Sequence, residues 1–392
     1  MYRSICILGR QPALGLAELE TLYGADRVAP LSTHVAGLTL EASDVDFTRL
    51  GGSTRLASVI GEVDSVSWPQ IEKALRTSGI HIAKSLPPEG KIKLGLSVYG
   101  LDISPAKLTA AGLTLKKILR SGDRSVRLVP NQAAELSTAQ VFHNALTGNL
   151  GIELLIVVGK SSTIIAHTLT VQDIDSYTLR DRGRPKRDAR VGMLPPKLAQ
   201  IIINLVGPMP EHSVILDPFC GTGVLLQEAL LMRYDVTGTD LEPRMIAYSD
   251  ANLEWAHERL GTENAYMLTV GDATSHQWEL PIDAVACETY LGRAFTSAPS
   301  REILEQTASD VNLILKKFLK NIHPQLARGT RLCLAVPAWQ TNPGSFRHLQ
   351  FIDHLADGGF KRINLTHVNN ADLLYYREDQ IVARELLVLE VF

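Results

Sequence analysis

The 392-residue sequence lacks any uninterrupted apolar run of the roughly 20 residues that a membrane-spanning helix needs. Its first residues also lack the long apolar stretch and cleavage site of a signal peptide, so we expect a cytoplasmic protein with no membrane partner. Only four cysteines occur, and no two form a CxxC pair, which argues against a zinc site or a disulfide framework. The histidines are scattered without a second ligand at metal spacing, so we predict no metal-binding residue.

The sequence also has no large excess of positive or negative charge. The formal net charge is −3, so the chain as a whole does not favour a polyanionic partner, and any nucleic-acid surface must be local. With 45% apolar and 21% charged residues, the composition is that of a folded globular protein rather than a disordered one. The length is enough for two or three domains.

The first 175 residues show short alternating strand and helix patterns. Residues 2–8 have the pattern of a strand, and leucines at helical spacing predict a helix over residues 13–23. From residue 91 onward the order is strand, helix, strand, helix, strand, strand. We therefore predict an α+β region made of two domains, residues 1–60 and residues 61–175.

A basic linker, residues 176–192, is predicted to follow. Residues 180–190 carry six positive and two negative charges, with a glycine and a proline that disfavour a helix. One interpretation is a solvated linker, and the other is a strap that contacts the phosphates of an RNA. In the second case the contacting side chains would be Arg182, Arg184, Lys186 and Arg187.

Residues 193–392 are predicted to form an α/β domain. Apolar strands that alternate with helices are typical of a parallel, doubly wound sheet. The predicted strands are residues 214–216, 235–238, 265–270, 284–287 and 331–336. Near the end, residues 373–376 and 381–391 predict an antiparallel hairpin that closes the sheet.

The strongest motif is Asp-Pro-Phe-Cys-Gly-Thr-Gly at residues 217–223, directly after a predicted strand. Glycines there let the backbone pass close to a ligand, and the next helix offers the N–H groups of its N-terminus to a carboxylate. A dinucleotide site would require GxGxxG and a phosphate loop would require GK[ST], and neither is present. Cys220 has no evident histidine partner, so we expect it to pack under the ligand rather than act as a nucleophile.

Two acids end the next two predicted strands. Asp240 lies about 20 residues beyond the glycines, where a carboxylate can accept hydrogen bonds from both ribose hydroxyls. Asp272 ends the following strand, and the carboxyl edge of such a sheet is where ligands bind. Alone, each acid would more often cap a helix. Together with the glycine loop they predict a ligand with an amino-acid end, a ribose and an adenine.

These motifs resemble the successive cofactor motifs of class I S-adenosylmethionine-dependent methyltransferases. Residues 192–205 resemble the segment before the glycine loop in tRNA guanine-N2 methyltransferases that carry a THUMP domain, and residues 135–141 are similar to the start of a THUMP helix. The resemblance covers nearly the whole chain. It implies a ferredoxin-like and THUMP region, a class I (Rossmann-like) methyltransferase domain, S-adenosylmethionine as cofactor, and tRNA or another structured RNA as partner. It leaves open whether an activating protein subunit is needed.

The resemblance also implies residue roles in the cofactor site. The methionine part of the cofactor would be bordered by four residues, Asp217, Cys220, Gly221 and Gly223. Asp240 would hold the ribose and Asp272 the adenine, while Leu241 would pack on the purine.

The chain departs from this family after the fourth strand of the domain. The family's target-base loop reads Asp or Asn, Pro, Pro, aromatic, whereas residues 288–291 read Glu-Thr-Tyr-Leu. Glu288 occupies the position of the acid that accepts a hydrogen bond from the target amine, and Tyr290 could supply a ring that stacks on the base. The extra methylene of Glu288 displaces its carboxylate, and a misplacement of about 1 Å can cost on the order of 100-fold in rate.

Three functions are consistent with these observations. The first is methylation of the N2 amino group of a guanine in tRNA. The second is a cofactor-binding RNA-binding protein with little or no methyl transfer, and the third is methylation of an adenine or cytosine amino group in RNA or DNA. The intact set of cofactor motifs favours an enzyme.

Overall fold

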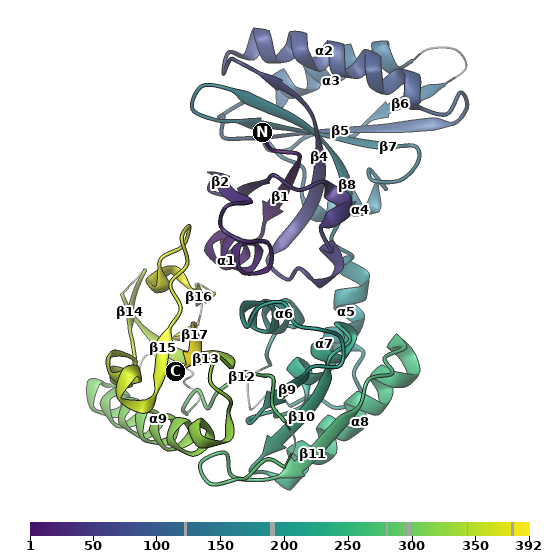
Figure 1. The fold of residues 1–392 in the computed structure, drawn as a ribbon. Coiled ribbons are helices and arrows are strands. Elements are labelled where there is room, and N and C mark those ends of the chain that lie inside the picture. The colour runs from purple at the N-terminus through teal and green to yellow at the C-terminus, as the bar shows by residue number, and fades with distance from the viewer. Residues whose placement is uncertain are drawn as a thin grey trace. The chain divides into compact units, whose positions relative to one another are not determined.

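The computed structural model describes residues 1–120, 124–188, 193–279, 281–293, 295, 299–342, 344–377 and 380–392. Residues 189–192 of the predicted linker and residues 378–379 of the predicted hairpin connection lie outside this set. The chain divides into two compact units (Figure 1). The first contains Met1–Leu16, Tyr23–Thr48 and Gly52–Ser176, and the second contains Ala17–Leu22, Arg49–Gly51 and Tyr177–Phe392. No helix in the described ranges is long and apolar enough to cross a lipid bilayer.

The N-terminal unit is built on one sheet, whose described strands run in the order β2-β3-β1-β4-β8-β7-β5-β6. The strands are β1 (Ser4–Leu8), β2 (Val28–Ser32), β3 (Val35–Leu38), β4 (Ser53–Val63), β5 (Lys91–Tyr99), β6 (Ser125–Leu128), β7 (Gly151–Val158) and β8 (Thr163–Val171). The helices of this half are α1 (Pro12–Tyr23), α2 (Trp68–Ser85), α3 (Pro105–Leu119) and α4 (Thr138–His143). Residue 60, the predicted domain boundary, lies inside β4, which pairs with both β1 and β8.

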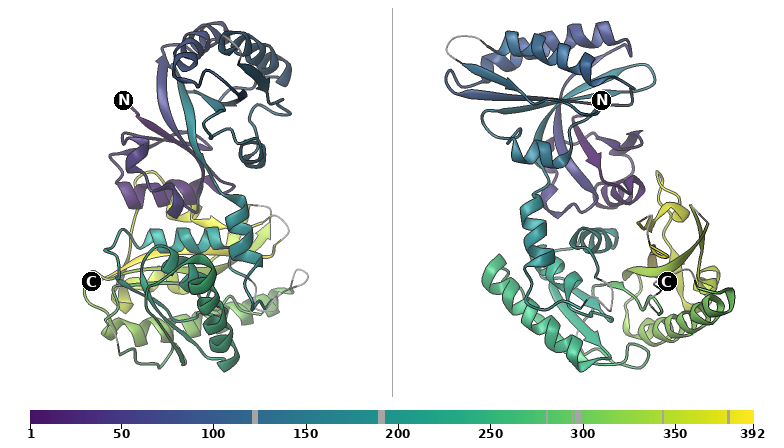
Figure 2. Two further views of the ribbon diagram at one scale, coloured as in Figure 1. Left: turned by 90° about the vertical axis from the view of Figure 1, so that its right-hand side faces the viewer. Right: turned by 180° about the vertical axis from the view of Figure 1, so that it is seen from behind.

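Helices α2 and α3 cover one face of this sheet (Figure 2). Pro105 starts α3, and the side chain of Ser104 accepts a hydrogen bond from the N–H of Lys107, so the first turn is capped. In α2, Ile71 and Leu75 are buried one turn apart and belong to the cluster formed with the strands beneath. This apolar core forms on one face of the sheet and leaves the outer faces of the helices to solvent.

The C-terminal unit contains the second sheet, in the order β11-β10-β9-β12-β13-β17-β15, with β14 paired to β13 and β16 to β17 among the described strands. Its strands are β9 (Val214–Asp217), β10 (Asp235–Asp240), β11 (Tyr266–Val270), β12 (Ala284–Glu288), β13 (Arg331–Asn342), β14 (Ser345–Arg347), β15 (Phe360–Arg362), β16 (Leu374–Tyr375) and β17 (Val382–Val391). The helices from residue 174 onward are α5 (Ile174–Arg182), α6 (Pro196–Leu205), α7 (Val224–Leu231), α8 (Pro243–Leu260) and α9 (Arg301–Ile322).

Strands β9 to β13 are parallel, and β17 runs antiparallel to β13 and to β16. Strand β12 begins Ala-Val-Ala-Cys and is buried on both faces, as expected for a central parallel strand. Helix α9 buries Val311, Leu315 and Phe318 in the same cluster as Val285 and Leu332 of the sheet. The predicted α/β fold class, with its parallel sheet and terminal antiparallel pair, is confirmed.

The basic stretch begins differently from the prediction. Helix α5 continues through Arg182, although the glycine and proline were expected to prevent a helix. The N–H of Gly183 donates to the carbonyl oxygen of Leu179 at 2.8 Å, so the helix ends only there. The reason is tertiary, because the guanidinium of Arg180 pairs with the carboxylate of Glu228 of α7 at 2.5 Å and anchors the last turn of α5.

Candidate cofactor and target-base site

Three acids lie at one edge of the C-terminal sheet. Asp217, Asp240 and Glu288 each end one of the parallel strands β9, β10 and β12. Burial raises the pKa of Asp217 well above its usual range, and the negative charges of Asp240 and Glu288 raise it further. The structure therefore places together three acids that are up to 71 residues apart in sequence, Asp217 and Glu288 being the most distant, at the edge where α/β sheets bind ligands.

The glycine loop between β9 and α7 has the conformation that its glycines permit. Gly221 and Gly223 have φ values of +53° and +76°, in the left-handed region that favours glycine. A Cβ atom on Gly223 would lie 2.9 Å from the hydroxyl oxygen of Ser249. The N–H of Gly221 donates to a carboxylate oxygen of Asp240 at 2.9 Å, so the loop is held by one of the acids at the sheet edge.

Cys220 lies buried beneath this loop. Its N–H donates to the carbonyl oxygen of Thr239 at 2.9 Å, and the hydroxyl of Ser249 lies 3.8 Å from its sulfur. Burial is the main cause that raises the pKa of the thiol well above its usual range, and the charges of Asp217 and Asp240 add to it. A thiol held in its protonated form is a poor nucleophile, so Cys220 is suited to packing rather than to catalysis.

The residues at the ends of β10 and β11 are more exposed. Asp240 also accepts a hydrogen bond from the N–H of Glu242 at 2.9 Å, and the side chain of Leu241 is 66% exposed. Asp272 is exposed, and one of its oxygens accepts hydrogen bonds from the N–H and the hydroxyl of Thr274, both at 2.8 Å. These bonds lower the pKa of Asp272, which keeps it ionised. The described residues 273–279 form a turn and no helix, so this contact stabilises a turn and is not the helix cap that was the alternative for this acid.

Glu288 is held by a side chain that the sequence motifs did not indicate. The Nε atom of Arg384, on β17, donates to a carboxylate oxygen of Glu288 at 2.5 Å. Both side chains are mostly buried, with exposures of 15% for Glu288 and 8% for Arg384. An arginine and a glutamate side by side at 384–385, before the apolar run Leu386–Leu389, were the available signal. Nothing in the sequence indicated which acid Arg384 would contact.

The two residues after Glu288 lie in different environments. Thr289 is buried, and its N–H donates to the carbonyl oxygen of Ala335 at 3.0 Å. Tyr290 is 45% exposed, and Gly292 has a φ of +86°, where the chain turns. An exposed ring next to a buried acid is an arrangement that allows stacking on a base.

The four basic residues predicted to contact RNA are in two different environments. Arg182, Lys186 and Arg187 are exposed. Arg184 is only 4% exposed, and its guanidinium lies 3.5 Å from the hydroxyl of Thr222 in the glycine loop. Arg184 is therefore packed against the glycine loop, whereas the other three side chains are at the surface.

The basic segment is packed against the domain rather than solvated throughout. The N–H of Lys186 donates to the side-chain oxygen of Asn252 of α8 at 2.9 Å, and the amide nitrogen of Asn252 donates to the carbonyl oxygens of Lys186 and Thr222. Asp188 pairs with Arg244 of α8 at 3.0 Å. One amide side chain thus ties the segment and the glycine loop together.

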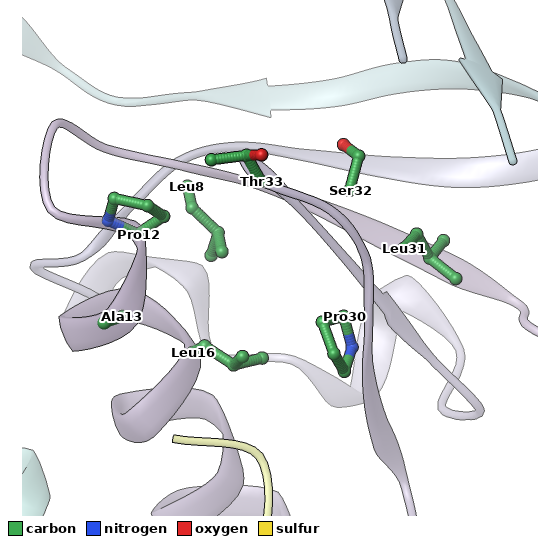
Figure 3. Close-up of a pocket in the computed structure, with 8 residues that line it drawn as sticks. All are labelled: Leu8, Pro12, Ala13, Leu16, Pro30, Leu31, Ser32 and Thr33. Atoms are coloured by element: carbon green, nitrogen blue, oxygen red, sulfur yellow. The ribbon is translucent and has the colours of Figure 1, made fainter. Parts of the chain in front are cut away.

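A cavity of about 300 Å³ lies in the N-terminal unit, between the start of α1 and the β2–β3 connection (Figure 3). It is lined by Leu8, Pro12, Ala13, Leu16, Pro30, Leu31, Ser32 and Thr33. None of these side chains is titratable, and none of the predicted site residues is among them. The cavity therefore has no part in the chemistry at the sheet edge.

Comparison with known proteins agrees with this geometry. Residues 184–341 match the profile of UPF0020, the RMKL-like methyltransferase domain. Over 146 residues the chain is 31% identical to a tRNA (guanine(10)-N2)-dimethyltransferase of Methanothermobacter thermautotrophicus. The matched segment covers 37% of this chain and 39% of the relative. Over 118 residues it is 36% identical to the protein of the same name from Pyrococcus abyssi, covering 29% of this chain and 33% of the relative. The matches thus span well under half the length of these relatives.

The fold of the whole chain is similar to that of a solved structure. TrmN from Thermus thermophilus superimposes with a TM-score of 0.55 over 100% of both chains, at 17% sequence identity. At that identity the likeness concerns the fold alone. Residues 184–341 are thus similar in sequence to an RMKL-like methyltransferase domain, and the whole chain is similar in fold to TrmN.

Proposed function

We propose that this protein is an S-adenosylmethionine-dependent methyltransferase that acts on the N2 amino group of a guanine in tRNA. The observation that carries the proposal is the convergence of Asp217, Asp240 and Glu288 beside the glycine loop of a methyltransferase domain. The names of the relatives, tRNA (guanine(10)-N2)-dimethyltransferases, support the choice of base and of RNA. A tRNA substrate also supports the predicted cytoplasmic location.

The residues at the sheet edge fit S-adenosylmethionine. Asp217 suits the amino group of the methionine part, while Asp240 suits the ribose hydroxyls, because each acid is fixed by a backbone hydrogen bond at the strand end. The exposed Leu241 offers an apolar surface to the purine, and the ionised Asp272 offers an acceptor to its amino group. When bound, the cofactor supplies an electrophilic methyl group.

Glu288 and Tyr290 would act on the target base. The exocyclic amine of guanine is a weak nucleophile because its lone pair is delocalised into the ring. A carboxylate oxygen of Glu288 that accepts a hydrogen bond from this amine orients the nitrogen, and it can take the proton that the nitrogen loses when the new N–C bond forms. The exposed ring of Tyr290 offers a face on which the base can stack.

The RNA would be bound by the N-terminal unit, which we propose to be a ferredoxin-like and THUMP region, and by the basic segment. The exposed Arg182, Lys186 and Arg187 of that segment can neutralise phosphates. Arg184 is the exception, because its burial against Thr222 places it in the support of the cofactor loop.

The test is nucleoside analysis by mass spectrometry of tRNA incubated with the protein and S-adenosylmethionine that carries an isotopically labelled methyl group. We expect label in N2-methylated guanosine, and loss of that label with Glu288→Ala. Asp250→Ala is the matched control, because Asp250 is an exposed acid of α8 whose carboxylate accepts a hydrogen bond from the hydroxyl of Tyr266, and it should keep full activity. Label in adenosine or cytidine would change the assigned base.

A cofactor-binding protein without methyl transfer is the second candidate. It is favoured by the pairing of Glu288 with Arg384 and by the absence of the family's two prolines from the loop. Calorimetry separates the two candidates, since normal S-adenosylmethionine binding with no label in any tRNA nucleoside would support this second function.

A further inference from the structure

The contact between Arg384 and Glu288 spans a strand. Glu288 ends β12 opposite Ala335 of β13, whereas Arg384 of β17 lies opposite Pro337 of the same strand. The guanidinium therefore reaches across β13 from a position two residues further toward the carboxyl edge of the sheet. Strands β12, β13 and β17 are neighbours in the sheet (Figure 1). The pair thus joins the acid of the target-base loop to the terminal antiparallel strand.

Stability alone is a weak reason for such a pair. Removing two charges from water costs free energy that their attraction often fails to recover, and apolar residues of similar volume are commonly as stable. Here the pair lies at the edge where Asp217 and Asp240 also end their strands, and β17 continues from Leu386 to Leu389 with apolar, buried residues. A requirement for an oriented carboxylate at that place accounts for its presence.

The surroundings of Glu288 favour its neutral form, and Arg384 opposes them. Burial raises the pKa of Glu288, and the charge and hydrogen bond of Arg384 lower it. From β9, Asp217 faces Glu288 with a charge of the same sign, and the thiol of Cys287 precedes it on its own strand. Arg384 is the cation in this group, so without it the carboxyl would hold a proton over a wider pH range.

We propose that Arg384 is a positioning residue for methyl transfer, which draws the carboxylate of Glu288 toward β17 and keeps it an acceptor for the target amine. The proposal rests on the function proposed above. It explains how a glutamate can serve where the family has the shorter aspartate or asparagine, because the pull across β13 takes up the additional methylene. The second carboxylate oxygen and the remaining lone pairs stay available to the base.

A neighbouring ion pair provides a matched control. Arg362 of β15 pairs with Glu385 of β17 at 3.0 Å, and Glu385 is at least as buried as Arg384. Successive residues of a strand point to opposite faces of the sheet, so Glu385 and Arg384 lie on different faces. Arg362→Gln therefore removes an arginine from a partly buried pair with β17 without touching Glu288, and Glu385 keeps its contact with His348.

The first experiment compares steady-state kinetics of Arg384→Gln, Arg384→Lys and Arg362→Gln in the full chain. We expect Arg384→Gln to lower kcat by about 10- to 100-fold, with the KM for tRNA and the Kd for S-adenosylmethionine changed less than about 3-fold. Arg384→Lys should recover part of the rate, and Arg362→Gln should retain it. In a Glu288→Gln background, Arg384→Gln should add less than about 2-fold. An equal loss in both backgrounds would overturn the proposal.

The second experiment follows pH. Because only the ionised carboxylate is a full acceptor, the rate should rise with pH as Glu288 ionises, and Arg384→Gln should move this rise by about one unit to higher pH. NMR titration of protein with carboxyl-13C glutamate, with the Glu288 signal assigned by its loss in Glu288→Gln, reports the same ionisation without catalysis. If the unaltered protein methylates no RNA, the proposed function fails, while the NMR midpoint still decides the role of Arg384. If Arg384→Gln leaves the midpoint of the Glu288 titration unchanged, the proposed role of Arg384 is wrong.

Discussion

At the level of the single residue, Asp240 both holds the glycine loop and is proposed to bind the ribose of the cofactor. Its oxygens accept hydrogen bonds from the N–H groups of Gly221 and Glu242, which shapes the glycine loop, and we propose that the same carboxylate binds the ribose. Asp240→Ala should weaken S-adenosylmethionine binding at least about 10-fold in calorimetry, because hydrogen bonds to a charged group contribute about 1.5–3 kcal/mol each. Asp240→Asn should lose less, and Asp250→Ala should lose nothing. Unchanged affinity in the alanine variant would remove Asp240 from the cofactor site.

Asp217 should give the cofactor-free protein a measurable pH dependence. Burial raises the pKa of Asp217 well above the ordinary 3.8, so the folded state binds this proton more tightly than the unfolded chain does. Its contribution to the free energy of unfolding is complete below that ordinary value and is lost as pH rises through the raised pKa. Asp217→Asn cannot ionise, and should therefore become more stable than the unaltered protein as pH rises. Urea denaturation at a series of pH values measures the difference, and parallel curves would contradict it.

At the level of the element, the Arg180–Glu228 pair fixes α5 to α7. Both side chains are buried, at 9% and 0% exposure. Arg180→Ala should lower the free energy of unfolding by about 3 kcal/mol or more, because it leaves a buried carboxyl without its partner. Arg180→Ala with Glu228→Ala should recover part of that loss. The control is Arg233→Ala, whose pair with Glu211 is exposed on both sides and should change stability by less than about 1 kcal/mol.

The elements that the sequence predicted correctly are those with strong local patterns. Strands β9 and β12 follow apolar runs, β10 follows the βαβ alternation, and the ends of these three strands placed Asp217, Asp240 and Glu288 at one edge. Helix α5 was missed because Gly183 and Pro185 suggest a coil, whereas the contact that holds the helix comes from α7. Arg384 could not be found because its contact depends on the antiparallel register of β13 and β17, and the two partners are 96 residues apart.

At the level of the whole molecule, the salt dependence of tRNA affinity should distinguish the exposed basic residues of the segment from the buried Arg184. Replacing the exposed Arg182, Lys186 and Arg187 with glutamine should weaken tRNA binding and reduce the salt slope by up to about 0.9 for each phosphate that is no longer neutralised. Arg184→Gln should leave the salt slope unchanged, because Arg184 is buried against Thr222. Fluorescence anisotropy over a range of salt concentrations gives both slopes. Equal slopes for the triple variant and the unaltered protein would mean that the segment is only a linker.

The side chain of Asn252 determines where the chain can be divided. By binding both Lys186 and Thr222, it makes residues before the predicted domain start at 193 part of the framework of the cofactor loop. A fragment that begins at residue 193 would lose this tie and the Arg180–Glu228 pair, whereas one that begins at residue 173 would keep both. Both fragments lack Ala17–Leu22 and Arg49–Gly51 of the same compact unit, so we expect the shorter fragment to be cut by trypsin faster than the longer one. The C-terminal half therefore includes the segment before residue 193, and a transplanted version should carry α5 with it.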